Sequence, residues 1–390
     1  MSDFVFNTTA SIRQGWGSAA RLGEVVDTLP FSNNRSEIFF VTDPGIIKLG
    51  LAIGAIENLK TCGFDVVIYD QVQADPKDST VLDAVATAKM HDAACIVGFG
   101  GGSSMDVAKM IALLANTDQP LDEMYGVNRA KGTRLPLVLV PTTAGTGSEV
   151  TAVSILTTGT EEKKGVVSPI ILPDIAVLDA ELTMGLPPHI TAATGVDAMV
   201  HAIEAFTSKN PNNNPISRAL AKEALMLLGS NIREAVTNSS NQEAREKMLL
   251  GSMLAGQAFA NSPVAAVHAL AYPVGSLFHV PHGLSNALVL EAVMRFNAPE
   301  CGAEYAELAP LVFSDIDMTR DGQAVAAEFI ERLGALNVEL GLESGLQQVG
   351  ISRSDIPKLA SDAMNQTRLL VNNPRGIQEE DAARIYEASF

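Results

Sequence analysis

The sequence is poor in aromatic residues and in cysteine. Aromatic side chains make up 5% of the 390 residues, with one tryptophan. A core of aliphatic side chains and glycine fits a helix-rich α/β protein better than a β-sandwich. The three cysteines, Cys62, Cys95 and Cys301, lie far apart and lack metal-type spacing. This pattern argues against a disulfide framework and favours a reducing cytoplasm.

Basic residues are also scarce. The 27 Lys and Arg face 45 Asp and Glu, which gives a net charge of −18. Nucleic acids and anionic membranes require a basic face, so neither is expected as a partner. No apolar run approaches the roughly 20 residues of a membrane span. The first 17 residues have neither a basic region nor an apolar one, so no signal peptide is expected.

The first half of the chain alternates β-branched runs with helical patterns. This alternation predicts a parallel sheet with helices on both faces. From about residue 189 nearly every segment has helical periodicity. We therefore predict an α/β domain over 1–185 and an all-helical domain over 186–390, with the boundary where Gly185, Pro187 and Pro188 interrupt the pattern. The expected strands are 36–43, 64–70, 93–100 and 135–141, the expected helices are 46–60, 79–90 and 104–115, and 151–179 is expected to be rich in strands.

A glycine-rich segment, GFGGGSSMDVAK (98–109), follows the third strand. Gly100, Gly101 and Gly102 would let the backbone approach a pyrophosphate, and the helix that opens at 103–106 would supply unpaired amides. The alternative is a turn that merely allows tight packing of strand and helix. Asp43 ends the first strand, 57 residues before Gly100, which reverses the usual order of glycines and then acid. Asp43 could accept hydrogen bonds from an adenosine ribose. Taken without the glycine loop, however, Asp43 is better interpreted as a turn residue in T-D-P-G.

A second polar loop, PTTAGTGSEVT (141–151), follows the fourth strand. Thr142, Thr143, Thr146 and Ser148 offer hydroxyl groups beside two glycines. Two such loops at the carboxyl ends of consecutive strands favour a nucleotide-binding crevice.

Two segments of the second half could hold a metal ion. GVDAMVHAIE (195–204) places Asp197 and His201 four residues apart, on one helix face. VHALAYPVGSLFHVPHG (267–283) adds His268, His279 and His282. Three imidazoles and one carboxylate suit Fe²⁺, Zn²⁺, Mn²⁺ or Co²⁺ and leave room for a substrate oxygen. From spacing alone, hydrogen-bonded structural histidines remain an equal alternative.

Together, and in this order, these four motifs resemble the iron-containing alcohol dehydrogenase family, which shares its scaffold with dehydroquinate synthase. The resemblance runs over essentially the whole chain. It implies that the first domain binds a dinucleotide, that the second binds one divalent metal ion and carries catalysis, and that the two meet in a cleft. It also implies hydride transfer between NAD(H) and a small alcohol or aldehyde, with Fe²⁺ as the expected metal and Zn²⁺ as the alternative, in a homodimer or larger homo-oligomer. The implied metal ligands are Asp197, His201, His268 and His282, and the implied cofactor contacts are Asp43, Gly100, Gly101, Gly102, Ser103, Asp106, Thr142, Thr143, Thr146, Ser148 and Lys164.

The sequence departs from the family pattern at two places. Tyr272 stands where many members carry a second histidine, four residues after the third ligand, and that histidine is usually assigned to substrate or proton handling. Tyr272 could donate a hydrogen bond in its place or simply narrow the pocket, and a proton relay could run through Tyr272 or the ribose hydroxyls. His279 matches no ligand position and is expected to act beside the site or in the structure. Another departure is Ala74-Asp75-Pro76, where many members have an Asn before the Pro. Positions aligned with the family's substrate pocket are mostly apolar: Val153, Phe259, Tyr272 and Leu369.

Other functions on the same scaffold stay open at this point. A hydroxyacid–oxoacid transhydrogenase would retain its nucleotide and turn over without added NAD. A lyase like dehydroquinate synthase would need several basic residues, in which region 182–290 is poor. A metal-free binding protein would show no alcohol-dependent formation of NADH.

Overall fold

The computed structural model describes residues 3–30, 36–159 and 162–390. The chain forms two compact units. The α/β unit consists of Asn7–Thr143 and Gly147–Met184. The helical unit consists of Met1–Phe6, Ala144–Thr146 and Gly185–Phe390.

A six-stranded sheet organises the α/β unit. Its order is β1-β9-β6-β4-β2-β3, and every neighbouring pair is parallel. The predicted parallel sheet is confirmed. A smaller sheet has the order β5-β8-β7. Strands β7 and β8 come from the stretch 151–179 that was expected to be rich in strands, of which residues 160–161 are outside the described ranges, and β5 comes from before it. The strands are β1 (Ser11–Gln14), β2 (Glu37–Val41), β3 (Asp65–Tyr69), β4 (Cys95–Gly100), β5 (Gly126–Val127), β6 (Leu137–Pro141), β7 (Val153–Thr157), β8 (Lys163–Val167) and β9 (Ile175–Leu178).

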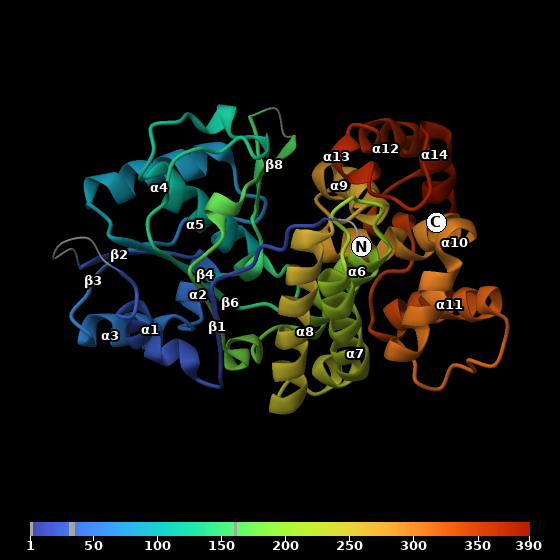
Figure 1. The fold of residues 1–390 in the computed structure, drawn as a ribbon, viewed down its shortest axis with the longest axis horizontal. Helices are drawn as coiled ribbons and strands as arrows, with labels where there is room; N and C mark the ends of the chain where they lie inside the picture. The colour runs from blue at the N-terminus through green and yellow to red at the C-terminus, as the bar shows by residue number, and fades with distance from the viewer. Residues whose placement is uncertain (1–2, 31–35, 160–161) are drawn as a thin grey trace. The chain divides into compact units, whose positions relative to one another are not determined.

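Two apolar cores form because alternate side chains of each strand point to opposite faces of the sheet. Phe39 and Val41 of β2 pack with α4 (Asp78–Met90) and α5 (Gly102–Leu114). Ile38 and Phe40 pack on the other face with α1 (Leu22–Val26), α2 (Pro44–Lys48) and α3 (Ile53–Thr61). Helices therefore cover both faces (Figure 1).

One predicted helix is wrong in detail. The single helix expected over 46–60 is two helices, α2 and α3. Gly50 lies between them with φ 71°, a left-handed conformation that favours glycine and that an α-helix cannot contain. The apolar periodicity runs through both helices, so periodicity alone did not reveal the break.

The helical unit contains α-helices and short 3₁₀ turns throughout its described C-terminal part (Figure 1). None of the helices in the described ranges combines the length and apolar character that a membrane span requires. The helices are α6 (Pro188–Thr207), α7 (Pro215–Thr237), α8 (Gln242–Asn261), α9 (Ala266–Phe278), α10 (His282–Val312), α11 (Gly322–Glu339), α12 (Ile356–Ala363), α13 (Thr367–Leu370) and α14 (Glu379–Ala388).

The NNPRG segment (372–376) joins parts of the helical unit that are distant in sequence. The side-chain amides of Asn373 and Asn297 bond each other reciprocally, at 2.7 and 3.0 Å. Arg375 donates to the carbonyl of Phe296, and its guanidinium lies 4.2 Å from the centre of that ring. The segment therefore has a structural role, because it binds to α10 through these contacts.

Candidate active site

Helix α6 presents two of the four predicted metal ligands. It opens after Pro187 with Pro188 in its first turn, where the missing N–H of proline removes no helical hydrogen bond. Asp197 and His201 follow one turn apart, and both side chains are buried. The i,i+4 spacing read from the sequence thus puts them on the same inward face.

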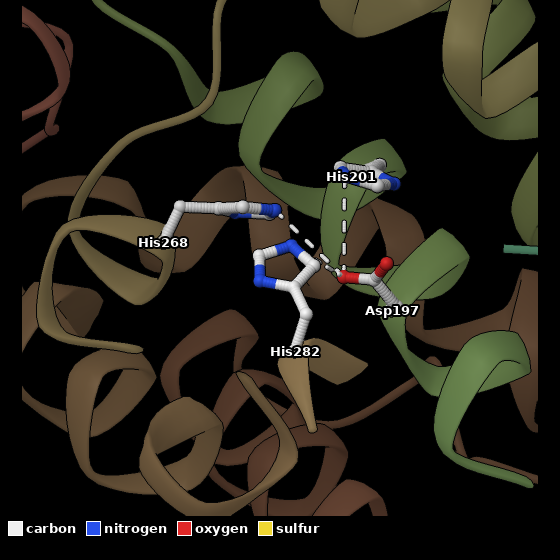
Figure 2. A group of neighbouring side chains, drawn as sticks. All are labelled: Asp197, His201, His268 and His282. Atoms are coloured by element: carbon white, nitrogen blue, oxygen red, sulfur yellow. Dashed lines mark ion pairs between the residues drawn. The ribbon is translucent and has the colours of Figure 1, made fainter. Parts of the chain in front are cut away.

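The other two predicted ligands come from the segment after α8. His268 lies in the first turn of α9, and His282 is the first residue of α10. Figure 2 shows the three imidazoles gathered around the carboxylate of Asp197. The Nε2 atoms of His201, His268 and His282 lie 3.9, 3.8 and 3.6 Å from Asp197 Oδ1. The structure therefore brings all four residues together, with their ligand atoms within 4.8 Å of one another.

The charges of this cluster suit a cation. Burial lowers the pKa of His201 to about 3, although the nearby Asp197 opposes the shift. His201 is therefore neutral at physiological pH and has a lone pair to offer. Burial would raise the pKa of Asp197, but the neighbouring histidines and the Asn286 amide lower it overall. A buried carboxylate surrounded by imidazole nitrogens has no fixed positive partner, which is the donor set that a divalent metal ion requires.

The distances also suit one ion. Two donor atoms bound at about 2.1 Å to a common ion can be no more than about 4.2 Å apart. The three distances to Asp197 Oδ1 all lie below that limit. The separations within the whole cluster are at most 4.8 Å, so small movements of the imidazole rings would bring all four donors around a single metal ion.

Two further polar residues contact this cluster, and the sequence analysis missed both. Glu204 Oε2 lies 2.6 Å from His268 Nδ1. Asn286 Nδ2 donates to Asp197 Oδ1 at 2.6 Å. Each lies at a helical interval from a predicted ligand, Glu204 three residues after His201 and Asn286 four after His282. This helical spacing from the predicted ligands is the sequence feature that could have identified Glu204 and Asn286.

The predicted glycine loop sits at the carboxyl end of β4, in the α/β unit. Gly100 has φ 152°, and a Cβ there would come within 2.7 Å of Ser104 Oγ. Tight packing, the alternative interpretation, therefore accounts for Gly100. A Cβ on Gly101 would make only ordinary van der Waals contact, at 3.8 Å from Thr143 Oγ1, so the backbone there is not crowded beside the first turn of α5. Gly102 and Ser103 form that first turn and present its amides.

Asp43 lies beside this loop but has a structural task as well. Its Oδ1 accepts hydrogen bonds from the N–H groups of Gly45 and Ile46, so it caps α2. Oδ1 of Asp43 therefore has the turn-stabilising role that the alternative interpretation gives to this residue. The other oxygen, Oδ2, lies 3.4 Å from where a Cβ of Gly100 would stand, so the fold brings together two residues that are 57 positions apart.

Asp106 is held in a buried network rather than pointing freely from the loop. Ser148 Oγ donates to its Oδ1, and the N–H of Ile155 donates to its Oδ2. Lys109 also contacts it, at 3.3 Å. The network joins the two polar loops predicted to form the nucleotide crevice, so Asp106 and Ser148 fix the position of one loop against the other.

The remaining predicted cofactor contacts have varied surroundings. Thr142 is buried, and its N–H donates to the carbonyl of Gly100. Thr143 is the residue nearest to the Cβ position of Gly101, at 3.8 Å. Thr146 belongs to the helical unit. Lys164 lies on β8, partly exposed and 3.3 Å from Glu162.

Comparison with known proteins agrees with this arrangement. The family profile described as "Iron-containing alcohol dehydrogenase" matches residues 9–180. The profile described as "Fe-containing alcohol dehydrogenase family, C-terminal" matches residues 191–390. The chain belongs to the iron-containing alcohol dehydrogenase family.

Relatives of this iron-containing alcohol dehydrogenase cover its full length. Long-chain-alcohol dehydrogenase 1 of Geobacillus thermodenitrificans is 38% identical over 96% of this chain and 94% of its own. The structure of a 1,3-propanediol oxidoreductase superposes with a TM-score of 0.94 at 34% identity, covering 100% of both chains. A sulfoacetaldehyde reductase from Bifidobacterium kashiwanohense, solved in complex with NAD⁺, has a TM-score of 0.86 at 29% identity over 100% of this chain and 99% of its own.

Family membership fixes the class of reaction. The chain is an oxidoreductase of a metal-dependent family that acts on CH–OH groups. Its predicted cofactors, NAD(H) and a divalent metal ion, agree with the family's iron and with the NAD⁺ complex of a structural neighbour.

Aromatic side chains flank the candidate metal site of this iron-containing alcohol dehydrogenase. The ring of Phe259 stacks on His201, with centroids 4.4 Å apart. Tyr272 lies on α9 with its ring centroid 6.0 Å from that of His282. Leu369 is buried in the same unit, whereas Val153 belongs to the α/β unit. His279 lies outside the cluster: it is exposed and ends α9 in a left-handed conformation, φ 56°.

Proposed function

We propose that this enzyme interconverts small, uncharged primary alcohols or diols and their aldehydes, with its metal ion held by Asp197, His201, His268 and His282. The observation that carries the proposal is the convergence of three imidazole Nε2 atoms on one oxygen of a buried aspartate. The aromatic neighbours of the cluster support an uncharged substrate, since Phe259 and Tyr272 offer apolar surface.

The bound groups supply the chemistry, and the protein supplies their position. When bound, the metal ion would supply Lewis acidity toward the substrate oxygen, and the nicotinamide would supply the hydride chemistry. His201 contributes a neutral imidazole, because burial keeps its pKa far below physiological pH. Phe259 holds that ring in place by stacking. Tyr272 stands where its phenol can hydrogen-bond near the site, in the role that many relatives give to a histidine.

We propose that the loop at the N-terminus of α5 binds the pyrophosphate of NAD(H). The uncrowded backbone at Gly101, which has no contact closer than 3.8 Å at its Cβ position, and the unpaired amides of the first helical turn support this. Asp43, next to Gly100, would accept hydrogen bonds from the adenosine ribose through its second oxygen. Thr142 and Thr143 would line the same crevice, while Thr146 and Lys164 are proposed contacts on the family resemblance alone.

We also propose that the enzyme is a cytoplasmic homo-oligomer. Its three cysteines are all unpaired, which suits a reducing compartment. The oligomeric state follows the family resemblance, and light scattering of the purified enzyme measures it.

The proposal is tested by anaerobic reconstitution with Fe²⁺ or Zn²⁺, followed by NADH formation and consumption with a panel of alcohols and aldehydes. We expect turnover with short uncharged substrates and at least tenfold lower kcat/KM with charged ones such as sulfoacetaldehyde. A preference for charged substrates would contradict the substrate class. Turnover that needs no added NAD would favour the transhydrogenase.

His268→Ala tests the metal ligands directly. Loss of one of four ligands should leave less than about a tenth of the metal content after dialysis, with activity lost in parallel. His91→Ala is the matched control, because His91 is half-exposed in the α/β unit beside Glu37. A full complement of metal in inactive His268→Ala would mean that His268 acts in catalysis and does not bind the metal.

A further inference from the structure

Glu204 is a buried carboxylate to which the proposed mechanism gives no role. It lies on α6, seven residues after Asp197 and three after His201, so all three share one helix face. Its side chain is 5% exposed. Its two oxygens have different partners: Oε2 lies 2.6 Å from His268 Nδ1, and Oε1 accepts from the N–H of Val267 at 2.7 Å.

The Val267 contact explains why the carboxylate is fixed in place. Helix α9 begins at Ala266, and its N-cap residue, Ala265, has no side chain that could accept a hydrogen bond. The first N–H groups of a helix need acceptors from outside the helix. Glu204 supplies one of them from the neighbouring helix, and its negative charge also suits the N-terminal end of the α9 dipole.

The His268 contact determines which ring nitrogen carries the proton. A carboxylate accepts hydrogen bonds, so the 2.6 Å contact between Oε2 and Nδ1 favours the tautomer of His268 with its proton on Nδ1. The neutral ring then has its lone pair on Nε2. That atom is the one that faces the cluster, 3.8 Å from Asp197 Oδ1.

We propose that Glu204 is a positioning residue of the metal site, which holds the tautomer and the ring orientation of His268 so that Nε2 can bind the metal ion. The inference rests on the proposed function, because it takes the four-residue cluster as the metal site. Carboxylates that receive the second N–H of a ligand histidine typically change metal affinity by about 10–100-fold when removed. Because α6 also carries Asp197 and His201, one helix would set the geometry of three of the four ligands.

Glu204→Gln is the informative variant, since a glutamine has nearly the same shape. Its amide has one oxygen and one NH₂ group, so it cannot accept from both Val267 N–H and His268 Nδ1–H. If the oxygen keeps Val267, the NH₂ group faces His268 and favours the tautomer with the proton on Nε2, which cannot bind metal. We expect the Kd for Zn²⁺ or Co²⁺ to rise about 10–100-fold. The visible absorption of bound Co²⁺ should change as well.

A second variant and a control separate positioning from loss of structure. Glu204→Asp keeps both acceptors but shortens the side chain, and should weaken metal binding in the same direction. Tyr386→Phe removes a buried hydrogen bond from Tyr386 to the carbonyl of Leu270, on the same helix as His268. It should lower the melting temperature and leave the Kd within about threefold of the parent value.

The outcomes distinguish this inference from the proposed function. If the parent protein and His268→Ala bind Zn²⁺ equally, the cluster is not the metal site and the proposed function fails. If His268→Ala loses the metal but folded Glu204→Gln and Glu204→Asp stay within about threefold of the parent, the role of Glu204 is overturned while the metal site stands. If Glu204→Gln does not fold, the same comparison is made with Glu204→Asp.

Discussion

Glutamine in place of Glu149 should stabilise the protein at alkaline pH and change little near pH 4. Glu149 lies in the 3₁₀ turn η3 (Ser148–Val150) and is 1% exposed. Its Oε1 has no hydrogen-bond partner in the described part of the chain. The nearby Lys109 amine directs its hydrogen bonds to Ser148 Oγ, Thr151 Oγ1, the Val153 carbonyl and Asp106 Oδ1, at 2.7, 3.1, 2.7 and 3.3 Å. An ammonium group has three N–H donors, so none remains for Glu149.

The size of the effect follows from the pKa of this carboxyl. Burial raises the pKa of Glu149 from 4.5 to about 7, against smaller opposing effects of its own backbone and of Lys109. A raised pKa means that the folded state favours the neutral acid. The associated stability is therefore fully present below pH 4.5 and is lost as the pH rises through 7. The difference corresponds to about 3 kcal/mol, which glutamine, having no charge to gain, would retain.

Thermal unfolding of both proteins between pH 4.5 and 8.5 measures this difference. About 3 kcal/mol corresponds to roughly 4 °C if the whole chain unfolds together. The melting temperature of Glu149→Gln should match that of the parent at the acidic end and exceed it by that amount at the alkaline end. Glu123→Gln, an exposed glutamate of the same unit, should show no such divergence. Parallel pH profiles for the parent and Glu149→Gln would refute the reasoning.

Three other predictions concern the cofactor, the substrate and the fold. Asp43→Asn keeps an oxygen to cap α2 but removes the charge opposite a 2′-phosphate, so NADP(H) use should improve at least tenfold relative to NAD(H). Asp43→Gly should also improve the use of NADP(H), at some cost in stability. Equal kcat/KM values of the parent enzyme for NAD(H) and NADP(H) would contradict the role of Asp43. Tyr272→His should bind metal normally and shift preference toward smaller or more polar alcohols, because Tyr272 stands beside His282; an unchanged ranking over the substrate panel would place it outside the pocket. Asn373→Ala should lower the free energy of unfolding by about 1–3 kcal/mol, because it leaves the buried amide of Asn297 without its reciprocal partner. Urea denaturation measures this change, and an unchanged midpoint would mean that the pair contributes nothing to stability.

Local patterns in the sequence predicted the architecture of the first half and the four residues proposed as metal ligands. Strand–helix alternation predicts a parallel sheet because parallel strands need long crossovers, and the order β1-β9-β6-β4-β2-β3 is such a sheet. The four-residue interval between Asp197 and His201 fixes a shared helix face, since the period of an α-helix does not depend on the rest of the fold. Those inferences needed only neighbours along the chain.

Only the tertiary structure shows which hydrogen-bond partners each polar residue has, and therefore whether it is a candidate ligand, a helix cap or a residue that positions another side chain. The sequence could not show that Asp106 and Ser148, 42 positions apart, bond each other and Lys109. Nor could it show that Glu204 meets His268, 64 positions later, because that contact depends on how α9 packs against α6. Hydrogen bonds between side chains depend on three-dimensional proximity, whereas periodicity and turn chemistry report only the local backbone. The candidate ligands were therefore readable from the sequence, and the residues that hold them in position were not.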